Sequence, residues 1–244
     1  MQSIALANQK GGVGKTTTAV HLAHGYAISG RKTVLLDLDP QGNATLSVQG
    51  MQFGGEAETD ESSPFAYLEQ LADSLWILPS PGAERNIDPE TVPDSSRLAT
   101  LSDALEEAGV DCLIVDCPPR MDAWGITGLG LCDWVLIPAQ AEFFAMHGLT
   151  QMFETVDRVA KQDTRRTPKV RGVVPTLIDG SDPVSSEVLA DLRRHLGDRL
   201  LDSAVFRDSS FIEASSHGTT LFEFRPESKG ALCYLNLTME MLDG

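Results

Sequence analysis

The chain has 244 residues, 42% of them hydrophobic and 22% charged, and its formal net charge is −16. This length and composition suit one α/β domain, residues 1–244, with a substantial core, and they exclude a disordered chain. No apolar run approaches the roughly 18 residues that cross a bilayer, and residues 1–10 lack the features of a signal peptide, so we expect a soluble cytoplasmic protein.

Short aliphatic runs alternate along the chain with longer segments of helical periodicity. This alternation is typical of βαβ units and predicts an α/β P-loop fold, with a mainly parallel, twisted β-sheet flanked by helices on both faces. The predicted strands are 3–7, 33–38, 74–78, 112–116, 134–138, 170–174 and 204–206. The predicted helices are 15–29, 97–107, 143–161, 184–195 and 228–241. Residues 50–64, rich in Gly, Ser and acids, are expected to form a loop.

The strongest local pattern is the glycine-rich segment QKGGVGKTT at residues 9–17, between the first predicted strand and the first predicted helix. That order is the context of a phosphate-binding P-loop. Glycines let backbone N–H groups surround phosphate oxygens, Lys15 supplies a cation, and the Thr16 hydroxyl can bind Mg²⁺. A glycine-rich turn without a ligand would leave Lys15 unexplained. The predicted nucleotide-binding residues of this loop are Gly11, Gly12, Val13, Gly14, Lys15, Thr16 and Thr17.

Two carboxylates, Asp37 and Asp39, close the second predicted strand and are followed by Pro40 and Gly42. In an open α/β sheet, ligands bind at the carboxyl ends of the strands. Residues two apart in a strand share a face, so both acids can point to one ligand. A carboxylate there can order the water of a bound Mg²⁺ or the attacking water. The alternative is an ordinary turn after a strand.

The apolar strand 112–116 ends in Asp116, as does a Walker B segment, in which the carboxylate holds Mg²⁺ through water. Cys117 follows directly, but no neighbouring motif would activate it as a nucleophile. The four cysteines show no CxxC spacing, which argues against a structural zinc site and gives no disulfide framework. We expect them to be reduced thiols.

The phosphate loop departs from the usual pattern, because Gln9 stands where a glycine is expected and a second lysine, Lys10, follows it. In this respect the chain resembles the deviant Walker A ATPases, the group that contains ParA and Soj partition proteins, MinD and nitrogenase iron protein. Its signature is K-G-G-x-G-K-[ST]. The resemblance covers nearly the whole chain and is greatest to short, single-domain ParA or Soj proteins.

The resemblance implies an ATPase that uses ATP and Mg²⁺ and forms a homodimer in its ATP state. It assigns Lys10 a role at the phosphates of the partner subunit and Asp39 the placing of the hydrolytic water. The implied catalytic residues are Lys10, Lys15 and Asp39, and the implied metal residues are Thr16, Asp39 and Asp116. Phe206 and Arg207 fall where relatives close over the adenine base, although Phe206 replaces their usual proline.

The function implied is the positioning or segregation of a cargo, such as a plasmid, a chromosome or a protein organelle like a carboxysome. ATP-bound dimers of such proteins hold non-specific double-stranded DNA of the nucleoid, and a ParB-like or cargo-adaptor protein stimulates hydrolysis. In this chain Ser181 and Ser210 stand where many relatives carry arginine, and residues 51–112 hold fourteen acids against two bases, which opposes DNA binding. The remaining candidate DNA contacts are Arg193, Arg194, Arg207, Arg225 and Lys229.

Three other classes of protein fit the pattern less well. A MinD-like membrane-cycling ATPase needs a basic amphipathic C-terminal helix, but residues 235–244 are acidic, so no membrane partner is expected. An iron–sulfur reductase needs cysteines presented at a dimer interface, and the glycine-flanked cysteines of such proteins are missing. A non-enzymatic scaffold would leave the lysines and acids of the predicted site without a role.

Overall fold

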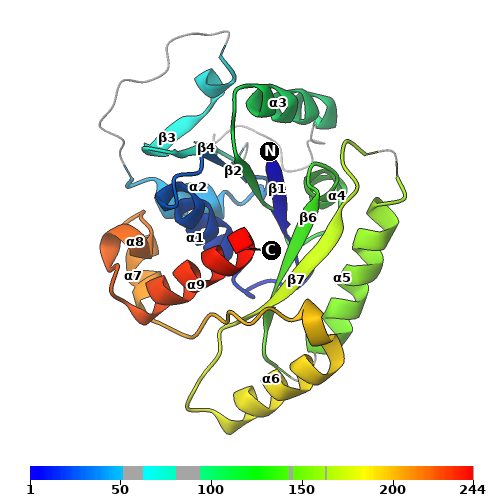
Figure 1. Cartoon of the computed structure of the whole chain (residues 1–244), viewed down its shortest axis with the longest axis vertical. Helices are drawn as coiled ribbons and strands as arrows, with labels where there is room; N and C mark the ends of the chain where they lie inside the picture. Colours follow the sequence, from blue (N-terminus) through cyan, green and yellow to red (C-terminus); the bar gives the residue numbers. More distant parts are fainter. Residues whose placement is uncertain (52–62, 81–93, 143–144, 163, 244) are drawn as a thin grey trace.

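A computed structural model describes residues 1–51, 63–80, 94–142, 145–162 and 164–243, and within them one seven-stranded sheet carries the fold (Figure 1). The strand order is β3-β4-β2-β5-β1-β6-β7, and every neighbouring pair is parallel except β3 with β4. The strands are β1 Gln2–Leu6, β2 Thr33–Asp37, β3 Glu69–Ala72, β4 Leu75–Leu78, β5 Cys112–Asp116, β6 Trp134–Gln140 and β7 Lys169–Thr176. The predicted mainly parallel sheet is confirmed.

Helices cover both faces of this sheet, as predicted (Figure 1). Ile4 and Ala5, adjacent in β1, belong to opposite apolar clusters because successive strand residues point to opposite faces. The cluster that holds Ala5 packs against α3, α4, α5 and α6, and the one that holds Ile4 packs against α1, α2 and α9. The helices are α1 Lys15–Ile28, α2 Asn43–Val48, α3 Ser95–Glu107, α4 Ala123–Gly130, α5 Ala145–Val159, α6 Pro183–Leu196, α7 Ser210–Ser216, α8 Leu221–Phe224 and α9 Lys229–Asp243.

Side-chain caps fix where several helices begin. Asp94 accepts a hydrogen bond from the Arg97 N–H at the start of α3, and Asp182 accepts one from the Val184 N–H at the start of α6. These carboxylates satisfy N–H groups that have no partner inside the helix. Helix α1 differs, because its N-cap is Gly14, which offers no side chain. The first N–H groups of α1 are therefore left for another acceptor.

The predicted strand at 204–206 is wrong. Residues 200–206 run beside β7 and its continuation, but they pair there only through separate bridges, Leu200 with Val173 and Phe206 with Ile178, so no continuous strand forms. The elements that the sequence did not predict, β3, α2, α4, α7 and α8, span four to eight residues each, which is too short for a clear periodic pattern. Most of the predicted loop at 50–64, and residues 143–144 of a predicted helix, lie outside the described residues.

Among the helices that the structure describes, none combines the length and the apolar character needed to cross a bilayer.

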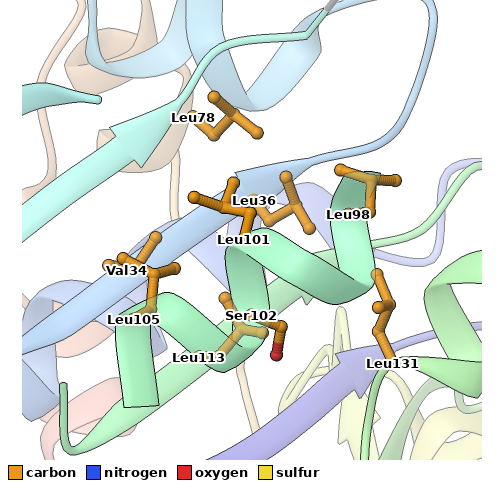
Figure 2. Close-up of a pocket in the computed structure, with 9 residues that line it drawn as sticks. All are labelled: Val34, Leu36, Leu78, Leu98, Leu101, Ser102, Leu105, Leu113 and Leu131. Carbon is orange, nitrogen blue, oxygen red and sulfur yellow. The ribbon is translucent and has the colours of Figure 1, made fainter. Parts of the chain in front are cut away.

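A small cavity of about 10 Å³ lies between α3 and the sheet, lined by leucine and valine side chains and by Ser102 (Figure 2). Ser102 is buried, and its hydroxyl has no hydrogen-bond partner in the described part of the chain. Figure 2 shows Ser102 in a lining that otherwise consists of leucine and valine side chains. A buried hydroxyl without a partner keeps its full cost of desolvation.

Replacement of Ser102 by alanine is expected to stabilise the protein. Ser102→Ala removes the unpaired hydroxyl and should raise the free energy of unfolding by about 1 kcal/mol. Urea denaturation at pH 7 measures this change. Thr100→Ala on the same helix is the control for helix propensity, because the exposed Thr100 hydroxyl donates to the Ser96 carbonyl. A loss of stability in Ser102→Ala would contradict the prediction.

Candidate nucleotide-binding site

The loop between β1 and α1 leaves its backbone open on one side. Gly12 and Gly14 have φ angles of 73° and 84°, in the left-handed region that glycine alone adopts freely. A Cβ atom added at Gly11 or Gly12 would meet nothing within 4 Å, whereas the other side of the loop is held by Thr176, whose hydroxyl donates to the Val13 carbonyl at 2.8 Å. The open side has the shape of a cradle for an anion.

Lys15 lies at the base of this loop and is almost fully buried. Its Nζ donates to the Lys10 carbonyl at 3.0 Å. Burial lowers the pKa of Lys15, while the negative charges of Asp116 and Asp39 oppose that change. An ammonium group has three N–H donors, and this one hydrogen bond to the backbone leaves donors for phosphate oxygens.

The register of two parallel strands brings the predicted acids together. Asp37 at the end of β2 pairs with Asp116 at the end of β5. The Asp37 carboxylate accepts hydrogen bonds from the Thr45 N–H at 2.9 Å and the Thr45 hydroxyl at 2.7 Å. Burial raises the pKa of Asp37 to about 6, and the bonds from Thr45 oppose the rise. Asp37 is therefore engaged in holding α2, and the other two acids are the ones available to a ligand.

Asp116 is the least satisfied polar group of the site. It is fully buried, and neither carboxylate oxygen has a hydrogen-bond partner among the described residues. Burial raises its pKa well above the usual range, with a further rise from Asp37, while the nearby Thr16 hydroxyl and Lys15 oppose it. A magnesium ion held through water would satisfy both oxygens, so Thr16 and Asp116 fit that group. The described residues form no cluster of three or more His, Cys, Asp or Glu ligands, so phosphate oxygens would have to complete the coordination.

Asp39 lies two residues beyond β2, on a turn that Ser80 fixes. The Ser80 hydroxyl donates to the Asp39 carbonyl at 2.7 Å, and the Asp39 side chain accepts the Gln41 N–H at 3.0 Å. Asp39 is 7% exposed. It is near enough to Lys15 to oppose the lowering of the Lys15 pKa. This arrangement holds a carboxylate at the rim of the phosphate loop.

Lys10 lies on the outer side of the loop and is about half exposed. Its side chain forms an ion pair with Glu142, and its backbone N–H donates to the Asn8 side chain at 3.0 Å. Asn8 in turn donates to the Pro138 carbonyl at 2.7 Å. In this state Lys10 is held by an acid of its own chain. Glu142 is not part of a recognisable motif, so the sequence could not predict it as the ion-pair partner of Lys10.

The predicted base-site residues lie beyond the end of β7. Phe206 bridges to Ile178, and the Arg207 N–H donates to the Ile178 carbonyl at 2.9 Å. Leu177, next to them, has a φ of 54°, a strained value for a residue with a side chain. The Lys229 Nζ lies 4.0 Å from the centre of the Phe206 ring, in cation–π contact. Lys229, a candidate DNA contact, therefore lies beside the predicted base site.

The structure separates the five candidate DNA contacts into two groups. Arg193 and Arg194 are exposed on α6 and pair with Asp202 and Asp191. The other group surrounds Asp208, which accepts the N–H groups of Ser210 and Gly230 and so brings the starts of α7 and α9 together. The members of this second group are Arg207, Arg225 and Lys229.

Comparison with known proteins agrees with this geometry. A family model described as an AAA domain matches residues 1–169. The chromosome-partitioning ATPase Soj of Thermus thermophilus is 34% identical, with 99% of this chain and 96% of the relative covered. A Mycobacterium smegmatis cobyrinic acid a,c-diamide synthase structure, with bound ATP analogue and magnesium, is 26% identical, with a TM-score of 0.72 and coverage of 99% and 94%. The Pyrococcus furiosus cell division ATPase MinD has a TM-score of 0.77 at 20% identity, with coverage of 99% and 98%.

The open glycine-rich loop, the buried lysine and the unpaired acid at the sheet edge define a P-loop ATPase. The Mycobacterium smegmatis protein has been solved both with an ATP analogue and magnesium and with ADP and magnesium. The chain belongs to the ParA/Soj family of partition ATPases within the ParA/MinD superfamily.

The unpaired carboxylate of Asp116 should make the nucleotide-free protein less stable than it could be. Asp116→Asn replaces the ionisable carboxyl by a neutral amide of similar size, and it is expected to raise the free energy of unfolding at pH 7 by about 1–3 kcal/mol, because folding raises the pKa of this carboxyl. A carboxyl whose pKa is raised by folding costs stability above its unfolded pKa, and this cost shrinks as the pH falls toward about 4. Urea denaturation at pH 7 and at pH 5 should therefore give a smaller difference at pH 5.

Asp157→Asn is the matched control, because Asp157 is an exposed acid on α5. It should leave the stability within about 0.5 kcal/mol of the original at both pH values. Equal stability of Asp116→Asn and the original protein at pH 7 would show that the carboxylate has a partner in solution.

Proposed function

We propose that this chain is an ATP-driven positioning ATPase, which dimerises with ATP, holds non-specific DNA and releases it after hydrolysis. The observation that carries the proposal is the unpaired Asp116 carboxylate beside the buried Lys15, below an open phosphate loop. A ParB-like or cargo-adaptor protein would stimulate hydrolysis. The cargo would be a plasmid, a chromosome or a protein organelle, and the protein would be cytoplasmic and associated with the nucleoid.

The residues of the site suit phosphoryl transfer. The N–H groups of residues 11–17 would bind the phosphate oxygens, with Lys15 neutralising their charge. Bound Mg²⁺ supplies charge neutralisation at the phosphates, and Thr16 and Asp116 would hold it, the acid through water. Asp39 would orient the attacking water from the rim of the loop. Burial around Lys15 lowers the local polarity and strengthens each of these electrostatic contacts.

Dimerisation would give Lys10 a new partner. In the described state its ammonium group pairs with Glu142, and both side chains are partly exposed. Exposed ion pairs contribute about 0–1 kcal/mol, so a triphosphate of higher charge on a second subunit can replace Glu142. Lys10 would then link the nucleotide of one subunit to the loop of the other.

The second basic group, Arg207, Arg225 and Lys229, is the better candidate for DNA contact. Arg225 donates to the Ser210 hydroxyl at 2.9 Å and pairs with Glu213 at 3.0 Å. Its guanidinium therefore lies at the start of α7, at the position where many relatives carry an arginine in place of Ser210. Phosphate contact needs clustered cations and no base-reading geometry.

Two substitutions separate ATP binding from hydrolysis. Lys15→Ala should weaken ATP binding by at least about 100-fold, because charged hydrogen bonds to phosphate are lost. Asp39→Ala should bind ATP within about threefold of the original and hydrolyse it about 100-fold more slowly, with an ATP dimer accumulating. Calorimetric titration, phosphate release and size-exclusion chromatography measure these effects. Lys161→Ala, an exposed lysine distant in sequence from the loop, is the control.

Loss of ATP binding in Asp39→Ala would contradict the role given to that residue. Full hydrolysis by Asp39→Ala would contradict it equally.

DNA retention tests the remaining part of the proposal. The protein should be retained on random-sequence duplex DNA with ATP and Mg²⁺, but not with ADP or in Lys10→Ala. Arg225→Ala should weaken retention. It should also reduce the slope of the logarithm of the DNA affinity against the logarithm of the salt concentration by about the contribution of one phosphate contact. Arg194→Ala on α6 is the matched control and should behave as the original protein. No retention by a protein that binds ATP would exclude DNA as its matrix.

A further inference from the structure

The turn of residues 217–221, which joins the end of α7 to the first residue of α8, contacts both segments that would respond to a nucleotide. One is α1, which continues directly from the phosphate loop. The other is α2, which follows the turn that carries Asp39. The 217–221 turn lies outside the candidate nucleotide-binding site, and no sequence motif indicated a function for it.

The first link runs through His21 on α1. The Leu221 N–H donates to His21 Nε2 at 3.1 Å, so Nε2 is the unprotonated ring nitrogen. Nδ1 must then carry the proton, and it donates to the Thr17 carbonyl at 2.8 Å. Burial lowers the pKa of His21 to about 4, which keeps the ring neutral and in this tautomer at pH 7. One ring thus joins the first turn of the phosphate-loop helix to the start of α8.

Neighbouring contacts hold this ring in place. His21 stacks on Tyr234 with ring centres 4.8 Å apart and meets the edge of Phe211 at 5.3 Å. One turn along α1, His24 Nδ1 lies 2.7 Å from the Thr220 hydroxyl. His21, His24, Thr220 and Tyr234 are buried. Because the interior there is close-packed, a movement of α1 would displace the groups that it contacts.

The second link is a direct contact between two glycines. The Gly50 N–H, just after α2, donates to the Gly218 carbonyl at 2.8 Å. A Cβ atom at Gly50 would lie 2.2 Å from the His217 carbonyl oxygen, and one at Gly218 would lie 2.5 Å from the Gly50 nitrogen. Gly218 also has a φ of 65°. The two backbones therefore touch, with no side chain between them that could yield.

We propose that the 217–221 turn is a joint that transmits nucleotide binding from α1 and α2 to helices α7 and α8. Helix α7 carries Ile212, 77% exposed, and Glu213, the partner of Arg225, so the joint would change the surface that faces solvent. This inference rests on the part of the proposed function that concerns ATP binding. It does not depend on DNA binding or on dimerisation.

Hydrogen–deuterium exchange of the full chain tests the joint, with and without a non-hydrolysable ATP analogue and Mg²⁺ at saturating concentration. Exchange in peptides from residues 210–224 should change at least about threefold with nucleotide in the original protein. In Gly50→Ala the added Cβ forces the two backbones apart. The nucleotide-induced change in exchange of residues 210–224 should then fall below about half of the change in the original protein. His21→Phe keeps the ring packing but removes both hydrogen bonds, and its response should fall similarly.

Gly109→Ala is the matched control, because Gly109 has a φ of 79° but nothing within 4 Å of its Cβ position. It should keep the full response. Calorimetric titration first measures ATP binding by each variant. A variant that binds ATP but lacks the exchange response has lost transmission through the turn, whereas a variant that does not bind ATP has lost the binding site. If Gly50→Ala does not fold by circular dichroism, His21→Phe decides. An unchanged response in the folded variants, or no response of 210–224 in the original protein, would overturn the proposal.

Discussion

The unpaired carboxylate of Asp116 is the constraint on which the site depends. Three parallel strands, β2, β5 and β1, place it at the carboxyl edge of the sheet, where Leu6 and Asp37 are its register partners. Burial in that layer removes water, and neither carboxylate oxygen has a hydrogen-bond partner among the described residues, although the Thr16 hydroxyl and Lys15 lie nearby. A fold that keeps such a group is less stable alone than with a ligand, because binding to the folded state stabilises it. We infer that binding of Mg²⁺ with a nucleotide at Asp116 would recover this cost in stability.

Three acids, Asp37, Asp39 and Asp116, lie at this carboxyl edge of the sheet and differ in the contacts that hold them. Asp37 is satisfied by Thr45 and holds the start of α2, so its charge is already used by the fold. Asp39 is held through its backbone by Ser80 and keeps its carboxylate at the rim. Asp116 is held by the strand alone. Alternation along β2 predicted that Asp37 and Asp39 share a direction, but only the packing of α2 decides which of them is free to act.

The sequence predicted those parts of the molecule that depend on short stretches of chain. The glycine-rich loop, the strand that ends in Asp116 and the long helices each have a local pattern, and these were confirmed. The ion pair of Lys10 with Glu142 and the hydrogen bond of Arg225 with Ser210 join residues through tertiary structure and left no pattern to read. The wrong strand at 204–206 has the same origin, since only the tertiary structure decides that this apolar segment pairs with the β7 side of the sheet through isolated bridges and does not form a regular strand.

Glycine shows most clearly what the fold adds to the sequence. At Gly12 an added Cβ atom would meet nothing, so the conformation and the empty space serve a ligand. At Gly50 and Gly218 the added atom would meet backbone, so the missing side chain serves contact between two segments of the chain. Both kinds of glycine lie on segments that adjoin the nucleotide-binding site. A backbone contact cannot relax by a side-chain rotation, and a displacement on one side of it must therefore reach the other.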